Sequence, residues 1–381
     1  MQILQEADIW ERLATTQKKI VLYGMGNGAD KILAACAQKG IEVSGVFASD
    51  GFVREKSFHG FPVISWSRMR EQYGAENLVV LLSFGSSRPD VLQTIGRVAA
   101  EAELYAPDVP AFGDGLFDRA FYDCHREELE AAFELLSDDE SRRIFENVVN
   151  FKLSGRISYL LDAQNDPQEV METLVRPTEL RASADLGAYN GDTVRELLGA
   201  SGGSLRRVWA MEPDARNYKK LALYAEGETR ADVLPIHAGA WSREELLRFD
   251  ASGNRNASFG ENRSAVLTDR PVKWHEIEAR SLDGVLSGAS VDYIKYDVEG
   301  AEREALLGST ETIRTYLPTL LVSLYHRNED LFALPLLIRE RFPDYRGFYL
   351  RRFAGIPAWD LNLYVRKEKI EPKDDKRRID K

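Results

Sequence analysis

The chain has 381 residues, enough for two domains of ordinary size. Hydrophobic residues make up 44% and charged residues 29%, which is typical of a globular protein with a buried core. The formal net charge of −11 argues against a broad basic face, so we expect no nucleic-acid partner. No apolar stretch approaches the length of a membrane span. Cys36 and Cys124 have no metal-ligand or redox spacing, and a cytoplasmic protein is the simplest expectation.

Residues 1–110 alternate apolar strands with helices, which predicts a domain with a parallel sheet. Strands are expected at residues 18–23, 41–47 and 77–83, with a helix at 30–39. The segment from Gly24 to Ala29 fits the pattern G-x-G-x-x-G/A, and Asp50 follows about twenty residues later. The pattern predicts a Rossmann-like fold, although tandem folds of this kind often serve as scaffolds. The candidate nucleotide loop consists of Gly24, Gly26, Asn27, Gly28 and Asp50.

Residues 111–166 are expected to form a helical connector that packs on the second domain. Helical spacing marks residues 126–136 and 144–151, and Ser137 to Glu140 has the form of a capping box. Residues 167–366 are expected to form a second domain, with strands at 183–186, 207–211, 233–237, 291–296, 319–325, 347–350 and 361–365. The last two lack an intervening helix, which favours an antiparallel edge on a parallel sheet. Residues 367–381 are expected to be a polar tail.

The most informative motif is Asp185-Leu-Gly-Ala-Tyr-Asn-Gly-Asp-Thr193, where an acidic residue ends a strand and a glycine turn leads into a helix. Such a loop lets the backbone approach a ligand, and the helix N-terminus suits a carboxylate. S-adenosylmethionine (SAM), a nucleotide-like cofactor with a carboxylate, would fit. Glu212 ends the next strand, where it could bind both ribose hydroxyls. The alternative for Glu212 is an exposed acid before a helix, whose N-cap is expected to be Asp214.

Two later segments could complete a site at the same edge of the sheet. Ala238-Gly-Ala-Trp241 is expected to end the third strand, where small residues would let an adenine ring lie against the backbone. Trp241 would be a lid or wall, or equally a core side chain. Asp297 and Glu299 are two residues apart at a strand end, so they can face the same cleft. There they could orient a hydroxyl, accept its proton or hold a metal. Glu302 and Glu304 are interpreted as residues that suit a helix dipole.

His326 follows a central strand at the edge where open α/β sheets bind ligands, although a lone histidine is more often structural. Its ordinary pKa would let it act as a general base near neutral pH. The other histidines lack zinc-ligand spacing, so we expect no metal.

Taken together, the second domain resembles the FkbM family of SAM-dependent methyltransferases. The resemblance covers about residues 140–366 and rests on Asp185 to Thr193, Glu212-Pro213, Gly239 to Trp241, Ser281 to Asp283 and Ile294 to Glu302. It implies a class I methyltransferase sheet behind a Rossmann-like first domain. The first domain is loosely similar to sugar-nucleotide-binding domains.

The resemblance implies O-methylation of a hydroxyl, with SAM as the methyl donor. The preferred acceptor is a saccharide or a related small molecule, and the first domain would suit one that is linked to a nucleotide. His326 is the expected base and Asp297 the expected orienting group. The expected cofactor-binding residues are Asp185, Gly187, Ala188, Tyr189, Asn190, Gly191, Asp192, Thr193, Glu212, Pro213, Gly239, Ala240, Trp241 and Asp297.

Two other function classes stay open from the sequence. One is an NAD-dependent nucleotide-sugar oxidoreductase that uses the first glycine loop, although the chain lacks a suitably placed Tyr-x-x-x-Lys pair. The other is a non-catalytic protein that binds SAM or a nucleotide sugar. The intact acidic positions Asp185, Glu212, Asp297 and Glu299 argue against a decayed site.

Overall fold

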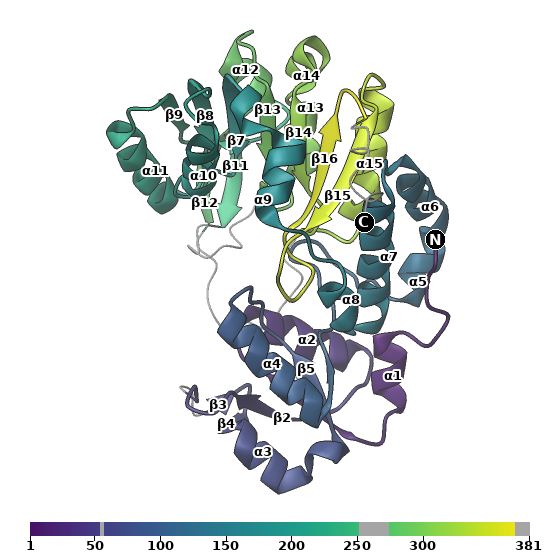
Figure 1. The fold of residues 1–381 in the computed structure, drawn as a ribbon. Helices are drawn as coiled ribbons and strands as arrows, with labels where there is room; N and C mark the ends of the chain where they lie inside the picture. Colours follow the sequence, from purple (N-terminus) through teal and green to yellow (C-terminus); the bar gives the residue numbers. More distant parts are fainter. Residues whose placement is uncertain (54–56, 251–273, 370–381) are drawn as a thin grey trace, which may run out of the picture.

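The computed structural model describes residues 1–53, 57–250 and 274–369. The chain forms two α/β units, one on a six-stranded sheet and one on a seven-stranded sheet, joined by helices along one flank (Figure 1). This is the predicted fold class of two tandem Rossmann-like sheets. Within the described ranges, no helix is long and apolar enough to cross a membrane.

The first unit, purple and blue in Figure 1, has the strand order β3-β4-β2-β1-β5-β6. All neighbouring strands are parallel except the β3–β4 hairpin. The order reverses between β1 and β5, and ligands of open α/β sheets bind at such a point. Its elements are α1 (Ile9–Thr15), β1 (Lys19–Tyr23), α2 (Asn27–Gln38), β2 (Val43–Ala48), β3 (Ser57–Phe58), β4 (Phe61–Ser65), α3 (Trp66–Tyr73), η1 (Ala75–Asn77), β5 (Leu78–Leu82), α4 (Pro89–Glu101) and β6 (Glu103–Tyr105).

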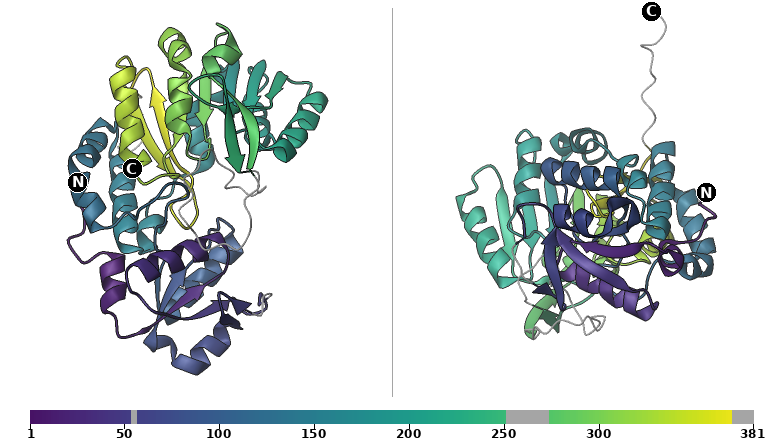
Figure 2. Two further views of the ribbon diagram at one scale, coloured as in Figure 1. Left: turned by 180° about the vertical axis from the view of Figure 1, so that it is seen from behind. Right: turned by 90° about the horizontal axis from the view of Figure 1, so that it is seen from below.

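Four connector helices follow: α5 (Arg119–Cys124), α6 (Arg126–Leu135), α7 (Asp139–Ser154) and α8 (Ser158–Leu161). They lie along the flank of the second unit, as both views in Figure 2 show. The N-cap of α7 is Asp138, whose carboxylate accepts a hydrogen bond from the Ser141 amide. The expected cap at Ser137 was therefore one residue early. Asp138 also pairs with the buried Arg351 at 2.6 Å, which fixes α7 to the second sheet.

The second sheet has the order β15-β16-β14-β13-β7-β8-β9. Strand β16 is antiparallel to both β14 and β15, as the missing helix between the last two strands predicted. The elements are α9 (Pro167–Val170), η2 (Met171–Val175), η3 (Pro177–Glu179), β7 (Ala182–Leu186), α10 (Asp192–Ala200), β8 (Arg207–Met211), α11 (Ala215–Gly227), β9 (Asp232–Ile236), α12 (Leu282–Leu286), β13 (Tyr293–Tyr296), α13 (Glu302–Leu307), α14 (Thr310–Tyr316), β14 (Thr319–Ser323), α15 (Asp330–Arg341), β15 (Gly347–Arg352) and β16 (Leu361–Arg366).

A separate three-stranded sheet corrects one expectation. Strand β9 ends at Ile236, and Gly239–Ala240 forms β10, which pairs with β12 (Trp274–Arg280) rather than ending the third strand. Strand β11 (Glu245–Asp250) completes this sheet in the order β10-β12-β11. A strand of two residues is too short for the sequence to show the alternation of apolar and polar residues that identifies a strand. The limits predicted for the domains stay a prediction, and residues 370–381 of the predicted tail lie outside the described residues.

The two units touch directly through the loops that follow β5 and β15. Ser86 and Ile356 exchange backbone hydrogen bonds of 2.9 and 3.1 Å. Next to them, a Cβ atom on Gly85 would lie 2.2 Å from the ring of Trp359, so the glycine lets the indole pack against the first unit's backbone. This contact borders the edge of each sheet at which ligands are expected.

A buried ion pair connects the exit of the first unit to the connector. Lys152 Nζ lies 2.6 Å from Asp108 Oδ2, and both side chains are less than 10% exposed. Removing one partner of such a pair leaves the other buried and unpaired, which costs about 3–5 kcal/mol.

We therefore expect Lys152→Met to lower the free energy of unfolding by about 3–5 kcal/mol, because Asp108 would stay buried without a counter-charge. The double variant Lys152→Met with Asp108→Leu should recover most of this loss. Urea denaturation of both variants checks the expectation. Equal destabilisation by the single and the double variant would show that the pair itself contributes nothing.

Candidate functional site

The loop after β7 is held rigidly by its neighbours on both sides. The amides of Gly187 and Ala188 donate hydrogen bonds of 3.0 and 2.9 Å to the carbonyl of Met211 at the end of β8. Gly187 has φ +86°, and a Cβ there would lie 1.9 Å from the carbonyl oxygen of Asp297. Only glycine fits at this point, because it allows both the backbone conformation and the close approach.

Glu212 lies beside this loop at the end of β8 and is 6% exposed. Its two carboxylate oxygens accept hydrogen bonds of 2.8 Å from the amides of Tyr189 and Asp214. Burial raises the pKa of Glu212 to about 7, and the two amides act against this rise. Asp214 caps α11 as predicted, by accepting from the amides of Arg216 and Asn217. The alternative of an exposed acid at position 212 is therefore wrong.

A cavity of about 280 Å³, here called the loop cavity, opens between the loops at this edge. Nine of the predicted residues line it: Gly187, Tyr189, Asp192, Thr193, Glu212, Pro213, Gly239, Ala240 and Asp297. The sequence did not point to Asp214, Asn217, Lys295, Val298, Tyr325 and Asp360, which line it as well, and Glu299 completes the wall.

The remaining predicted residues lie elsewhere. Ala188 and Gly191 are buried behind the loop, and Asn190 and Trp241 are absent from the lining of the loop cavity. Trp241 packs partly buried against the core, so the interpretation as a core side chain holds. Asp185 lines an adjoining cavity of about 230 Å³, and its carboxylate accepts a hydrogen bond from the Thr193 hydroxyl.

A buried lysine joins these parts. Lys295 Nζ lies 3.2 Å from Asp185 Oδ1, 3.3 Å from Asp297 Oδ2 and 3.3 Å from the carbonyl oxygen of Gly187. Burial lowers the pKa of Lys295, but the two carboxylates outweigh it, so the pKa is raised and the ammonium form is favoured. The sequence signal for Lys295 is a lysine inside an otherwise apolar, fully buried strand.

Asp297 is held in its ionised form by its surroundings. Burial raises its pKa, but Lys295 and His326, together with two hydroxyl donors, outweigh burial and lower the pKa to about 2. The donors are Ser323 Oγ at 3.0 Å and Tyr325 Oη at 2.9 Å, both to Asp297 Oδ1. Asp297 is therefore a fixed anion in the wall of the loop cavity.

His326 is 1% exposed and is surrounded by carboxylates. Its Nδ1 lies 2.8 Å from Glu302 Oε1, while its Nε2 has no hydrogen-bond partner and lies 3.5 Å from Glu299 Oε2 and 3.7 Å from Asp297 Oδ1. Burial lowers the pKa of His326, but Glu302, Glu299 and Asp297 outweigh it and raise the pKa to about 10. Glu302 lies in the first turn of α13, which fits its interpretation as a helix-dipole residue, and its burial against His326 is a further role that the sequence did not indicate.

Glu299 has the opposite tendency from Asp297. Burial raises its pKa to about 8, and although His326 opposes this rise, Asp297, Glu302 and Glu212 add to it. Carboxyl groups with a pKa in this range are suited to exchange protons near neutral pH.

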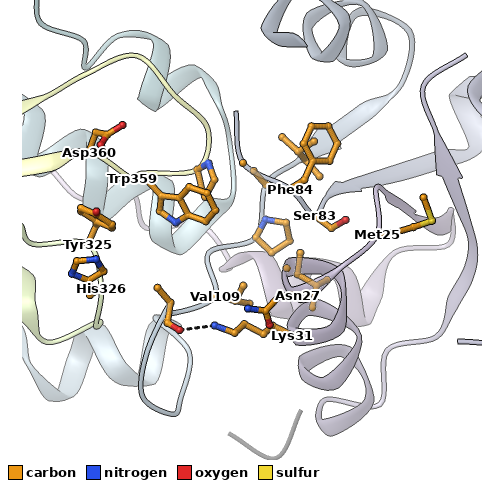
Figure 3. Close-up of a pocket in the computed structure, with 18 of the residues that line it drawn as sticks. Met25, Asn27, Lys31, Ser83, Phe84, Val109, Tyr325, His326, Trp359 and Asp360 are labelled. Carbon is orange, nitrogen blue, oxygen red and sulfur yellow. Dashed lines mark hydrogen bonds between the residues drawn. The ribbon is translucent and has the colours of Figure 1, made fainter. Parts of the chain in front are cut away.

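A second cavity, here called the interdomain cavity, has a volume of about 350 Å³ and lies between the two units (Figure 3). Its wall in the second unit includes His326 and Trp359, and its wall in the first unit includes Asn27, Lys31 and Phe84. It shares Glu299, Tyr325 and Asp360 with the loop cavity, so the two cavities adjoin at these side chains.

The glycine loop of the first unit is only partly as predicted. Asn27 and Gly28 line the interdomain cavity, and Gly24 and Gly26 lie in the turn before α2. Asp50 is exposed after β2 and is absent from the lining, because its carboxylate accepts hydrogen bonds from the amide and hydroxyl of Ser67. Nothing in this geometry favours Asp50 as a ribose ligand.

Three comparisons with known proteins bear on this site. Residues 185–350 match the model of the methyltransferase FkbM domain. Methyltransferase FkbM from Methylobacillus flagellatus KT has a similar fold, with 23% identity, a TM-score of 0.64, and coverage of 91% of this chain and 90% of that chain. No curated protein matches.

Two other solved structures are similar over about half of the chain. An rRNA methylase from Streptococcus thermophilus has 11% identity and a TM-score of 0.34, with coverage of 54% of this chain and 98% of that chain. Aeropyrum pernix fibrillarin in complex with natively bound S-adenosyl-L-methionine has 12% identity and a TM-score of 0.30, with coverage of 52% of this chain and 74% of that chain.

The matched range begins at Asp185, the residue at which the glycine loop starts, and includes Glu212, Glu299 and His326. The second unit therefore carries a match to the methyltransferase FkbM domain, and the residues that line the loop cavity, except Asp360, lie within the matched range.

Proposed function

We propose that the protein transfers a methyl group from SAM to a hydroxyl group, preferably of a saccharide. The observation that supports this best is that the loop cavity and the interdomain cavity adjoin at Glu299, with His326 beside it. Two substrates could therefore reach one point from opposite sides, and a group able to take up a proton is placed there. Aligning two reactants in this way is itself a large part of catalysis.

The residues of the loop cavity fit SAM by their chemistry. The carboxylate of Glu212 suits ribose hydroxyls, and the small Gly239 and Ala240 leave room for a flat ring. The N-cap Gly191 of α10 provides no side-chain cap, although the Thr193 amide donates to Asp192 Oδ1, and the start of this helix suits a carboxylate. Asp297 supplies a fixed negative charge that suits a sulfonium cation. When bound, SAM would supply a methyl group that is already activated for transfer.

The hydroxyl must lose a proton as its oxygen gains the methyl group. We assign this proton to Glu299, whose Oε2 lies 3.5 Å from His326 Nε2. His326 was the expected base, but the surrounding carboxylates favour its protonated form, so it is better suited to orient Glu299. Glu302 holds the other side of the His326 ring at Nδ1, so the ring orientation is fixed. Asp297 then acts as the orienting group, because its carboxylate is locked by Ser323 and Tyr325.

We expect Glu212→Gln to weaken binding of S-adenosylhomocysteine by about 10- to 100-fold, since a charged hydrogen-bond acceptor is lost. Calorimetric titration of the purified protein measures this, with NAD as a second ligand and thermal unfolding as a check on folding. The matched control is Glu226→Gln on the exposed face of α11, which should bind like the wild type. Binding of NAD but not S-adenosylhomocysteine by the wild type would reject the methyltransferase proposal.

The pH dependence of kcat/KM should report the proton acceptor Glu299. The form with a free base requires Glu299 to have lost its proton, so kcat/KM should rise with pH through about 8 and then level off. Glu299→Gln should lower the rate about 10²- to 10⁴-fold and remove this rise. The rate of S-adenosylhomocysteine release with a sugar acceptor gives the profile. An unchanged profile in Glu299→Gln would exclude Glu299 as a base.

The charge on His326 can be measured without an acceptor. Because Glu302 stabilises the imidazolium form, Glu302→Gln should lower the pKa of His326 from about 10 toward its ordinary value. Nuclear magnetic resonance of the ring nitrogens across a pH titration reads this directly. A His326 that is already neutral at pH 7 in the wild type would contradict the assigned charge.

A further inference from the structure

The interdomain cavity has a wall in the first unit for which the methyl-transfer chemistry has no use. It consists of the glycine loop after β1, the first turn of α2 and the end of β5, and it faces His326 and Trp359 across the cavity (Figure 3). These elements meet where the strand order reverses, at which ligands of open α/β sheets bind.

The glycines of this loop bring α2 against the sheet and leave space beside it. A Cβ on Gly28 would lie 2.3 Å from the carbonyl oxygen of Ser83, so only glycine lets the helix pack this closely on the end of β5. Gly26 has φ +107°, yet no atom would lie within 4 Å of a Cβ built there. The backbone at Gly26 is therefore uncovered beside the residues Met25 and Asn27 that line the cavity, and its conformation still demands glycine.

The wall in the first unit has a positive potential. Helix α2 begins at Asn27 without a side-chain cap, so its amides and its dipole present positive potential. One turn later, Lys31 Nζ donates to the carbonyl oxygens of Pro110 and Ala111, both at 2.7 Å, which holds a positive charge at this wall. The opposite wall carries the carboxyl groups of Glu299 and Asp360 together with the imidazole of His326. An anionic end of a ligand is thus favoured at the wall of the first unit.

A second observation marks the opposite wall as a ligand site. His326 lines this cavity, is 1% exposed, and has an Nε2 atom without a hydrogen-bond partner. Buried polar atoms are rarely left in this condition, so a ligand group that reaches Nε2 would satisfy it. Tyr325 and Trp359 stand beside it, and aromatic rings together with carboxylates suit the C–H faces and hydroxyls of a sugar ring.

We propose that the interdomain cavity binds a phosphorylated sugar, with its phosphate at the N-terminus of α2 and a sugar hydroxyl at Glu299 and His326. The assignment of the hydroxyl as the methyl acceptor rests on the proposed function, whereas the phosphate site does not. No bond to phosphorus forms or breaks, because the phosphate only positions the sugar. The hydroxyl oxygen would gain the methyl group as the methyl–sulfur bond of SAM breaks and S-adenosylhomocysteine leaves, and the hydroxyl proton would pass to Glu299. The first unit is then the part of the enzyme that selects the acceptor.

The test is calorimetric titration of the full chain with inorganic pyrophosphate, glucose, glucose 1-phosphate and UDP-glucose at up to millimolar concentration. The key variant is Asn27→Asp, which adds a negative charge at the first residue of α2. This charge favours the helix but repels a phosphate, so folding should be kept while binding is lost. The matched control is Gln93→Glu, which adds the same charge on the exposed face of α4 and keeps the oxygen that accepts from Arg97.

We expect the phosphorylated sugars to bind the wild type and Gln93→Glu alike, and Asn27→Asp at least about tenfold more weakly. Glucose should bind all three proteins equally. If no phosphorylated probe binds the wild type, or if Asn27→Asp binds them as tightly as the control, the proposal is wrong. If UDP-glucose binds more than about tenfold tighter than glucose 1-phosphate, the phosphate belongs to a nucleotide sugar, and comparable affinities assign it to a sugar phosphate.

Titration of the same proteins with S-adenosylhomocysteine separates the two proposals. Binding of S-adenosylhomocysteine without any phosphorylated sugar rejects the phosphate site and leaves the proposed function standing. Binding of phosphorylated sugars without S-adenosylhomocysteine rejects the proposed function and leaves the phosphate site. Asn27→Asp should bind S-adenosylhomocysteine like the wild type, because Asn27 does not line the loop cavity.

Discussion

The ion cluster around Lys295 is the interaction on which the rest of the site depends. Lys295 pairs in register with Asp185 across β13 and β7, so the two charges are fixed by the sheet itself. The same ammonium reaches Asp297 and the carbonyl oxygen of Gly187. Burying three charges is tolerated only when each has close partners. The loop after β7 and the segment from Asp297 to Glu299 are therefore tied to one point.

A second buried cluster, around His326, meets the first at Asp297. Here the carboxylates exceed the cations, because Glu299 and Glu302 join Asp297 around a single imidazole. The excess of negative charge raises the pKa of His326, while burial raises that of Glu299. Opposing groups with shifted pKa values in one cleft are a common feature of catalytic sites. A cation on the donor side would also be attracted to this excess of negative charge.

The two units act on one cavity because a few contacts hold them together. Gly85 receives the ring of Trp359, and Ser86 pairs with Ile356, directly beside the interdomain cavity. The buried ion pair between Asp108 and Lys152 also fixes the connector to the first unit. As a result, the loops at the point where the strand order of the first sheet reverses line the same cavity as His326 of the second unit. A fold that often serves as a scaffold is in this way placed where it can contribute to substrate selection.

The sequence by itself determined the fold class, most of the strands, and the loop from Asp185 to Thr193 with Glu212 behind it. These features depend on local periodicity, glycine turns and strand ends, all of which can be read along the chain. The tertiary structure decided the partners of Lys295, the burial of Glu302 against His326, and the packing of the partly buried Trp241 against the core. It also decided that Asp50 accepts hydrogen bonds from Ser67, while Asn27 and Lys31 line the interdomain cavity. Such contacts join residues far apart in the chain, and no local pattern specifies which buried charges will meet.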